Sequence, residues 1–366
     1  MGFTIKNFNE TMLKTKFPSY VMGIDIGGTN TNLAIAGIQN KRPILLFSLN
    51  FKSKELSSLS PAIKETINYA KEKYGIDIDN ACIGASGVVS TSKDYAELTN
   101  VEWNVNIKDI LEKTTLKTAH IINDFQTIGY GINLIDYREK NDILPVKEGY
   151  HDETATKAII GAGTGLGKSI LTYDKNLNAY IPHPSEGGHS DFPAQNNFEL
   201  ELIDFIKKNR NITKQISYEE LISGRGIESI YYFLQKQQKY EPTQYTKEIN
   251  KTLDKPVLIS KYKNLDETCK ETFQLFTKFY ARCAKNFVLD SLAKGGLYIA
   301  GGIAIKNQDI FTSKNFIEEF ENSHKRENIL KQTPIYLITN YDISLYGACF
   351  AAMHKNPNKN KIKQPI

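Results

Sequence analysis

A glycine-rich device that occurs twice is the feature that most constrains the fold. Residues 20–38, YVMGIDIGGTNTNLAIAGI, run as an apolar stretch, a GGTN turn and a second stretch of alternating small and apolar residues. Residues 158–173, AIIGAGTGLGKSILTY, repeat this order later in the chain. Each copy predicts a strand, a glycine turn and a second strand. Two copies of a hairpin device predict a duplicated domain with a cleft between the halves.

The second copy also comes close to a P-loop. Gly167-Lys168-Ser169 fits the end of G-x-x-x-x-G-K-[ST], whereas Ala162 occupies the position of the first glycine. A P-loop requires a helix directly after the lysine, because the helix N-terminus lies beneath the phosphates. Residues 169–173 are rich in β-formers instead. We therefore expect a hairpin tip at this position and not a P-loop.

Outside the two copies, alternating strand and helix signals predict an α/β protein. We expect a helix with Ser60 as N-cap that runs to Tyr74, and a long helix after Asp266 that Gly295-Gly296 ends. The other expected elements are strands at 81–89, 119–124, 297–302 and 334–338, a helix from about Phe125, and a surface excursion over 234–265.

Composition bounds the class of protein. The chain has 366 residues, enough for about two domains, with 40% hydrophobic and 24% charged residues. Its net charge of +5 is spread along the chain, which argues against binding to nucleic acid. No apolar run reaches the ~18–20 residues that cross a membrane, and no secretory signal opens the chain. The four cysteines are widely spaced, so we expect a cytoplasmic protein with free thiols and no zinc site.

The first glycine turn carries a candidate phosphate and magnesium site. Its backbone N–H groups are open to a phosphate because glycine lacks a Cβ. Asp25 precedes the turn, and a carboxylate beside phosphates requires a cation between them, which predicts Mg²⁺ held through water. The turn residues are Gly27, Gly28, Thr29 and Asn30, and the second copy supplies Gly163, Thr164 and Gly165. Taken alone, the first turn also fits an ordinary hairpin.

Asn123-Asp124 lies at the end of the strand expected at 119–124, where α/β proteins commonly bind ligands. An aspartate at this position can act as general base and accept the proton of an attacking hydroxyl. It can also be the N-cap of the next helix, where Asp is favoured. The pattern by itself leaves both roles of Asp124 open.

A second polar group occurs on the glycine-rich loop EGGHSDF, where Glu186 and His189 lie three residues apart. An acceptor and a donor or acceptor at this spacing suit the vicinal hydroxyls of a sugar. His189 also fits a structural role, whereas no Cys or second His lies at metal-ligand spacing. Glu219 either adds a further acceptor or is a carboxylate on a surface helix.

With these residues in view, the chain resembles the bacterial-type glucokinase family of the actin-like sugar kinase superfamily. It lacks the C-x-C-G zinc cluster of the repressor-containing branch and is similar to the non-zinc branch. The matching segments are collinear over about residues 20–352. They are GIDIGGTN (23–30), LTNVEW (98–103), IINDF (121–125), GAGTGLG (161–167), EGGHSDF (186–192), ISYEELISG (216–224), YIAGGI (298–303) and YDISLYGACFAA (341–352).

This resemblance implies two RNase H-like α/β domains, of the actin-like ATPase type, with a central cleft. The implied small domain covers 20–134 plus 342–366, the large domain covers 135–341, and residues 1–19 are an N-terminal extension. The resemblance also implies a homodimer, ATP and Mg²⁺ as cofactors, and D-glucose as the acceptor that becomes glucose 6-phosphate. In the implied site Asp124 is the catalytic base, the sugar contacts are Asn100, Asn123, Glu186, His189 and Glu219, and the adenosine motif contains Gly301 and Gly302.

Two cations depart from the pattern of the family. Lys168 stands where small or apolar residues are usual, and we expect its side chain to point to solvent. Arg225 follows Ser223-Gly224. Two alternative functions remain at this point: a kinase for another hexose, such as mannose or an amino sugar, and a switch that senses sugar or nucleotide without catalysis. A phosphoryl donor other than ATP is also open.

Overall fold

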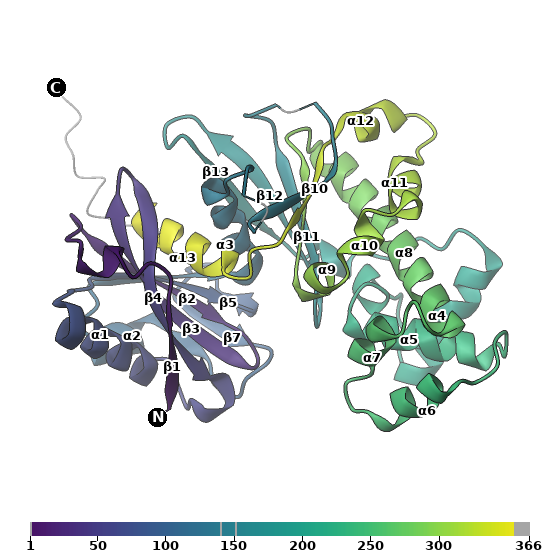
Figure 1. Cartoon of the computed structure of the whole chain (residues 1–366), viewed down its shortest axis with the longest axis horizontal. Helices are drawn as coiled ribbons and strands as arrows, with labels where there is room; N and C mark the ends of the chain where they lie inside the picture. The colour runs from purple at the N-terminus through teal and green to yellow at the C-terminus, as the bar shows by residue number, and fades with distance from the viewer. Residues whose placement is uncertain (1, 140, 151, 355–366) are drawn as a thin grey trace. The chain divides into compact units, whose positions relative to one another are not determined.

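The computed structural model describes residues 2–139, 141–150 and 152–354. The chain divides into two units (Figure 1). The first unit comprises the described residues up to Asp136, residues 174–182 and residues 340–354. The second unit comprises residues 137–173 and 183–339. In the described part of the chain, no helix combines the length and the apolar character needed to cross a membrane.

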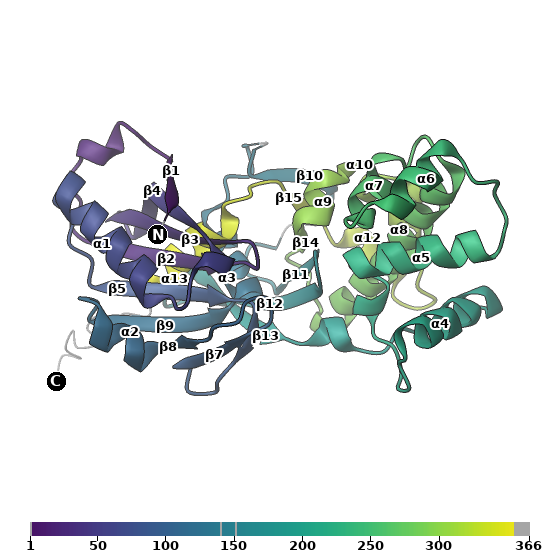
Figure 2. The ribbon, with the colours of Figure 1, turned by 90° about the horizontal axis from the view of Figure 1, so that it is seen from below.

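A six-stranded sheet, in the order β1-β4-β3-β2-β5-β9, forms the centre of the first unit (Figure 2). Strands β1 to β4 pair antiparallel, whereas β2, β5 and β9 run parallel. The carboxyl ends of the three parallel strands therefore meet at one edge of the sheet. The strands are β1 (Phe3–Asn7), β2 (Tyr20–Ile26), β3 (Asn30–Gln39), β4 (Arg42–Lys52), β5 (Asn80–Ala85) and β9 (Thr118–Asn123).

Helices pack on both faces of this sheet. α1 (Ser60–Tyr74) and α2 (Ile107–Lys113) share one hydrophobic cluster with it, and α3 (Asp124–Gly131) and α13 (Ile343–His354) share another. Leu33 and Ala34 of β3 fall in different clusters because successive side chains of a strand point to opposite faces. A small sheet of β6 (Gly87–Val89), β7 (Tyr95–Leu98) and β8 (Val105–Asn106), and the 3₁₀ turns Met12–Lys14, Ser53–Glu55 and Ile132–Leu134, complete this unit.

The second sheet has the order β10-β15-β14-β11-β12-β13. Its strands are β10 (Ile143–Lys147), β11 (Lys157–Ala162), β12 (Leu166–Asp174), β13 (Ala179–Ser185), β14 (Leu297–Ala300) and β15 (Ile335–Ile338). The longest helix, α8 (Glu267–Ser291), contributes a stripe of buried aromatic residues to the main cluster of the second unit. The other helices are α4 (Asn197–Arg210), α5 (Gly224–Lys236), α6 (Gln244–Lys251), α7 (Lys255–Lys261), α9 (Gly302–Lys306), α10 (Gln308–Phe311), α11 (Lys314–Glu321) and α12 (Glu327–Gln332).

Both copies of the glycine device are β-hairpins, as predicted. β2 and β3 pair down to Ile26 opposite Thr31, and β11 and β12 pair down to Ala162 opposite Leu166. Lys168 lies within β12, so no helix follows it directly. The P-loop alternative is therefore excluded, because its phosphate cradle depends on a helix N-terminus that this hairpin lacks.

The Lys168 side chain is buried, so the expectation that it points to solvent was wrong. It is 5% exposed, and its Nζ lies 5.4 Å from the ring centre of Tyr218 and 5.1 Å from that of Phe287. The alternation along β12 turns this side chain inward, where the ring of Phe287 on α8 and the ring of Tyr218 in the 3₁₀ turn Tyr218–Glu220 attract the ammonium. Lys168 therefore packs beneath the loop that contains Gly187, whose Cβ position lies 3.6 Å from Nζ.

Several expected boundaries also differ from the structure. Helix α1 begins at Ser60 with Leu59 as N-cap, and the Ser60 hydroxyl donates to Asp109 instead of capping. Helix α8 ends at Ser291, where Leu292 adopts a left-handed conformation (φ 45°), before the glycine pair that was expected to end it. The expected strand at 81–89 is interrupted between β5 and β6.

Two segments that were expected to be peripheral contribute to the folded units. The expected surface excursion over 234–265 contains α6 and α7, and it places Ile249 and Ile259 in the core of the second unit. Their burial follows from the amphipathic spacing of short helices, which a loop assignment cannot capture. Within the expected N-terminal extension, β1 pairs with β4 from Phe3 opposite Phe51 to Asn7 opposite Phe47.

Candidate functional site

The first glycine turn is fixed by the residues around it. Gly27 N–H donates to the Asn30 carbonyl at 2.9 Å, and the Ser53 hydroxyl donates to the Gly27 carbonyl at 2.6 Å. A Cβ on Gly28 would lie 2.9 Å from Cβ of Asn100, so only glycine permits this close approach. The turn and Asn100, which lie far apart in sequence, are therefore in contact. The sequence pattern did not indicate the role of Ser53.

Asp25 lies near the carboxyl end of β2 and is partly buried. Its Oδ2 accepts a hydrogen bond from the Ser344 hydroxyl at 2.8 Å. Burial raises the pKa of the Asp25 carboxyl above its usual range; the bond from Ser344 opposes this shift, and the nearby Asp342 carboxylate adds to it. A carboxylate in this setting lacks full compensation for its charge, which a cation can supply. Ser344 and Asp342 were not identified from the sequence as site residues.

The capping role that was open for Asp124 belongs to its neighbour Asn123. Asn123 Oδ1 accepts from Phe125 N–H at 2.9 Å, and Gln126 Oε1 accepts from Asn123 N–H at 3.2 Å, which forms a capping box at the start of α3. Asp124 is the first residue of α3 and is partly exposed. Its Oδ1 also accepts from Phe125 N–H at 2.9 Å.

The two aspartates of the first unit lie at the same edge of the sheet. Ile26 is paired with Ala85, and Ala85 with Asn123, so β2, β5 and β9 end in register. Asp25 therefore lies one residue before this edge, and Asp124 lies one residue after it. Asp124 lies in the first turn of α3, at the positive end of the helix dipole.

In the second unit, three glycine-containing segments come together. The Gly163-Thr164-Gly165 turn is closed by a bond of 2.8 Å from Gly163 N–H to the Gly165 carbonyl. Gly301 adopts φ 95°, and a Cβ on it would lie 2.6 Å from the Ala162 carbonyl oxygen. Gly224 N–H donates to the Gly163 carbonyl at 2.9 Å. The two predicted nucleotide motifs are therefore adjacent, and the start of α5 packs against the Gly163 turn. Gly224 was not identified from the sequence as a site residue.

Glu219 contacts this turn directly. Its Oε2 accepts from Leu166 N–H at 2.9 Å, and its Oε1 lies 3.1 Å from the Arg225 guanidinium. The side chain is 13% exposed and lies in the 3₁₀ turn Tyr218–Glu220. Glu219 is therefore not a carboxylate on a surface helix, and both of its oxygens have partners.

Glu186 and His189 are exposed; Glu186 directly precedes the 3₁₀ turn Gly187–His189, and His189 is its last residue. Glu186 Oε2 and His189 Nε2 lie 3.8 Å apart. A Cβ on Gly188 would lie 1.9 Å from the Leu166 carbonyl oxygen, so this loop packs against the β11–β12 hairpin. The N–H of the same Leu166 donates to Glu219. Leu166 thus links both segments that were predicted to contact a sugar.

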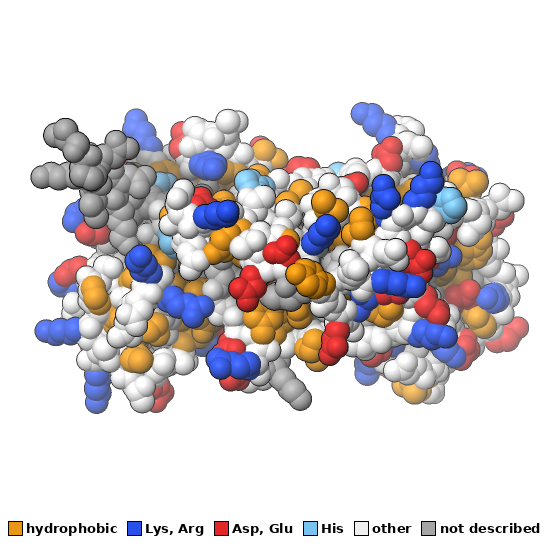
Figure 3. Space-filling view, turned by 90° about the horizontal axis from the view of Figure 1, so that it is seen from above, with side chains coloured by type: hydrophobic (Ala, Val, Ile, Leu, Met, Phe, Trp, Pro, Cys, Tyr) orange, Lys and Arg blue, Asp and Glu red, His pale blue; other side chains and the backbone are white. Residues whose placement is uncertain are grey.

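Other features of the described chain lie outside these groups. Within residues 2–139, 141–150 and 152–354, no group of three or more His, Cys, Asp and Glu side chains is arranged to hold a metal ion. On the face seen in Figure 3, basic and acidic side chains are interspersed.

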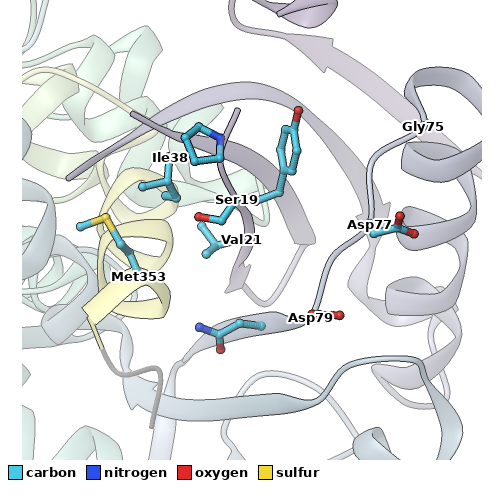
Figure 4. A pocket seen from close by; sticks show the side chains of 10 residues that line it. Ser19, Val21, Ile38, Gly75, Asp77, Asp79 and Met353 are labelled. Atoms are coloured by element: carbon cyan, nitrogen blue, oxygen red, sulfur yellow. The ribbon is translucent and has the colours of Figure 1, made fainter. Parts of the chain in front are cut away.

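A cavity of about 370 Å³ lies in the first unit (Figure 4) and is lined by Ser19, Val21, Ile38, Asp77, Asp79 and Met353, among others. It lies where β2 and β5 begin, at the opposite edge of the sheet from Asp25 and Asp124. The cavity is therefore separate from the candidate site.

Comparison with known proteins is consistent with this arrangement. The family model described as Glucokinase matches residues 22–355. A glucokinase of a Nostoc species is 32% identical over 342 residues, covering 90% of this chain and 97% of the relative. A glucokinase of Colwellia psychrerythraea is 31% identical and covers 88% of this chain and 93% of the relative.

Solved structures show the same fold. A glucokinase from an Antarctic psychrotroph has a TM-score of 0.74 at 24% identity and covers 91% of this chain and 98% of its own. The glucokinase of Balamuthia mandrillaris in complex with glucose has a TM-score of 0.75 at 22% identity and covers 91% and 93%. These likenesses identify the actin-like, mixed α/β architecture of sugar kinases. The chain thus belongs to the bacterial-type glucokinase family and is a transferase that phosphorylates glucose.

Proposed function

We propose that the chain transfers the γ-phosphoryl group of MgATP to the 6-hydroxyl of D-glucose, with Asp124 as the general base. The observation that carries this proposal is that β2 and β9 end at a common edge of the sheet. Asp25 and the glycine turn lie at the end of β2, and Asp124 directly follows β9. A base and a phosphate-binding turn at one edge can serve the two partners of a phosphoryl transfer.

Asp124 accepts the proton of the sugar hydroxyl as that oxygen attacks phosphorus. The bond from Phe125 N–H to Oδ1 orients its carboxylate at the start of α3. Asn123 fixes the start of α3 through its capping box, so the backbone that carries the base is held in place.

Asp25 fits a site for hydrated Mg²⁺, since this ion is commonly bound by one or two carboxylates together with substrate phosphates. The raised pKa of Asp25, caused mainly by burial, indicates a carboxylate whose charge is incompletely compensated. When bound, the ion supplies positive charge to the phosphate oxygens. The backbone N–H groups of Gly28, Thr29 and Asn30 complement it by donating to phosphate, whereas the Gly27 N–H closes the turn through its bond to the Asn30 carbonyl.

The proposal assigns nucleotide contacts in the second unit to Gly163, Thr164, Gly165, Gly301 and Gly302. Support comes from the packing of Gly301 against Ala162, which brings both glycine segments together. Gly163 and Gly302 have open space at their Cβ positions, so a phosphate or ribose can approach their backbones.

The proposed glucose contacts combine amide, carboxylate and imidazole side chains. They are Asn100, Asn123, Glu186, His189 and Glu219. The amide nitrogen of Asn123 serves as a donor to a sugar hydroxyl while Oδ1 caps α3. Membership of the glucokinase family favours glucose over another hexose and catalysis over a sensing role. We further propose a cytoplasmic homodimer.

The test is the release of ADP by purified protein with MgATP and glucose, compared with an Asp124→Asn variant of the same shape. We expect kcat to fall by about 10²–10⁴ in the variant, the range of general base catalysis. Glucose affinity is measured separately through Trp103, the single tryptophan. Its indole N–H donates to the Ser53 carbonyl at 3.1 Å, next to the first glycine turn. Unchanged kcat in the variant would refute the role of Asp124.

A further inference from the structure

Strand β1 lies outside the part of the chain that matches the glucokinase family, which begins at residue 22. It nevertheless pairs with β4 over its whole length, and Phe8 N–H then donates to the Leu46 carbonyl at 3.0 Å. Lys6 is therefore carried on a sheet strand, with a defined direction for its side chain.

From this strand, two side chains reach the start of α13. Lys6 Nζ lies 2.5 Å from Asp342 Oδ2 and 4.8 Å from the ring centre of Phe8. The Phe8 ring packs edge-on against Tyr346, with 6.3 Å between ring centres. Asp342 directly precedes α13, and its carbonyl accepts from Tyr346 N–H at 3.0 Å. An ion pair and an aromatic contact thus hold the same first turn.

That turn carries Ser344, whose hydroxyl donates to Asp25 Oδ2 at 2.8 Å. A continuous chain of contacts therefore runs from Lys6 through Asp342 and the first turn of α13 to the Asp25 carboxylate. Lys6 also supplies the cation that neutralises Asp342, the acidic side chain whose charge acts on Asp25.

We propose that Lys6 and Phe8 form a clamp on the first turn of α13, and that this clamp is a positioning device for the phosphate-binding side of the reaction. This inference rests on the proposed role of Asp25. The clamp keeps Ser344 against Asp25 and cancels the charge of Asp342, so an incoming triphosphate meets one uncompensated carboxylate instead of two. Its loss therefore weakens nucleotide binding and leaves glucose binding unchanged.

The experiment compares Lys6→Met with Lys71→Met, which removes another exposed ion pair of the same unit, the one to Asp77 at 2.7 Å. Binding of ADP without metal is measured by calorimetry, and KM is measured for both substrates. We expect about two- to fivefold weaker ADP binding in Lys6→Met, the range of an exposed ion pair. KM for ATP rises while KM for glucose stays the same. Lys6→Arg restores the wild-type values, and Lys71→Met matches wild type.

Two further measurements separate a clamp from general destabilisation. In an Asp342→Asn background, Lys6→Met has no added effect on ADP binding, because the pair is already broken. Amide exchange of residues 343–346 rises in Lys6→Met and Phe8→Ala, whereas exchange of the α3 backbone does not. Unchanged ADP binding in Lys6→Met, or an equal loss in the Asp342→Asn background, would overturn the inference.

Failure of the clamp and failure of the proposed function give different results. If Asp25 has its proposed role, Asp25→Asn lowers activity, and it abolishes the difference between ADP binding measured with Mg²⁺ and ADP binding measured without metal. If Lys6→Met leaves ADP binding unchanged while Asp25→Asn loses activity, only the clamp is rejected. A fully active Asp25→Asn rejects the assignment of Asp25 and the clamp together.

Discussion

Substitutions of Asn123 separate its structural role from its proposed role in catalysis. Its Oδ1 accepts from Phe125 N–H at 2.9 Å and caps α3, while the amide nitrogen is proposed to donate to glucose. Asn123→Ser keeps a side-chain oxygen that is favoured at the N-cap, whereas Asn123→Ala removes both the cap and the amide.

We expect Asn123→Ala to reduce the free energy of unfolding by about 0.5–2 kcal/mol, the range for loss of an N-cap, and to lower Tm by a few degrees. Asn123→Ser reduces the free energy of unfolding by only a small fraction of this amount, because serine is also favoured at the N-cap. Both variants lose one neutral hydrogen bond to the sugar, worth about 0.5–1.5 kcal/mol, so KM for glucose rises about two- to twelvefold in each.

Thermal unfolding followed by circular dichroism and steady-state kinetics measure the two effects on the same preparations. KM for ATP is the internal control, because Asn123 is not assigned to the nucleotide. An unchanged KM for glucose in Asn123→Ser would refute the sugar contact. Equal loss of Tm in the serine and alanine variants would refute the capping argument.

Three further predictions concern the second unit. Arg225→Met removes the guanidinium that lies 3.1 Å from Glu219 Oε1. We expect KM for glucose to rise about two- to fivefold at similar kcat, and Arg225→Lys to give an intermediate KM. A change confined to KM for ATP would contradict this prediction. Glu199→Gln breaks a buried ion pair in which both carboxylate oxygens of Glu199 contact Arg282, at 2.7 and 2.9 Å. We expect the free energy of unfolding, measured with denaturant, to fall by about 3–5 kcal/mol. A decrease below about 1 kcal/mol would show that the pair is dispensable. Burial lowers the pKa of Lys157 to about 8. The unfolded chain then binds more protons than the folded chain between about pH 8 and 10.5, so stability rises with pH across this window. Lys157→Met lacks this rise and is more stable at pH 7, by at most about 3 kcal/mol; parallel stability curves from pH 7 to 10 would contradict the assignment.

Local sequence signals predicted the elements that depend on neighbouring residues. The two hairpins followed from apolar runs around glycine turns, and the start of the long helix followed from Asp266, whose side chain accepts from Cys269 N–H at 3.0 Å. The C-terminal end of α1 followed from Gly75, which adopts φ 67°. These features depend on backbone conformation and capping within a few residues, and such information is present in a short stretch of sequence.

Lys168 and the segment at 234–265 show where local reasoning failed. A lysine in a hairpin is usually solvated, and the aromatic rings of Tyr218 and Phe287 favour the burial of Lys168. Tyr218 is fifty residues away in sequence. Ile249 and Ile259 were likewise assigned to the surface because their helices are too short to give a strong periodic signal.

The sequence by itself determined the family, the two glycine hairpins and the chemical types of the site residues, because motif order and strand periodicity are written along the chain. Only the tertiary structure decided which of these residues meet. Register across parallel strands places Asp25 and Asp124 at one edge, and packing of Ser344 against Asp25 and of Gly224 against Gly163 adds residues that no motif indicated. Contacts between distant segments arise from the burial of shared apolar faces, and the free energy of that burial is a property of the whole fold.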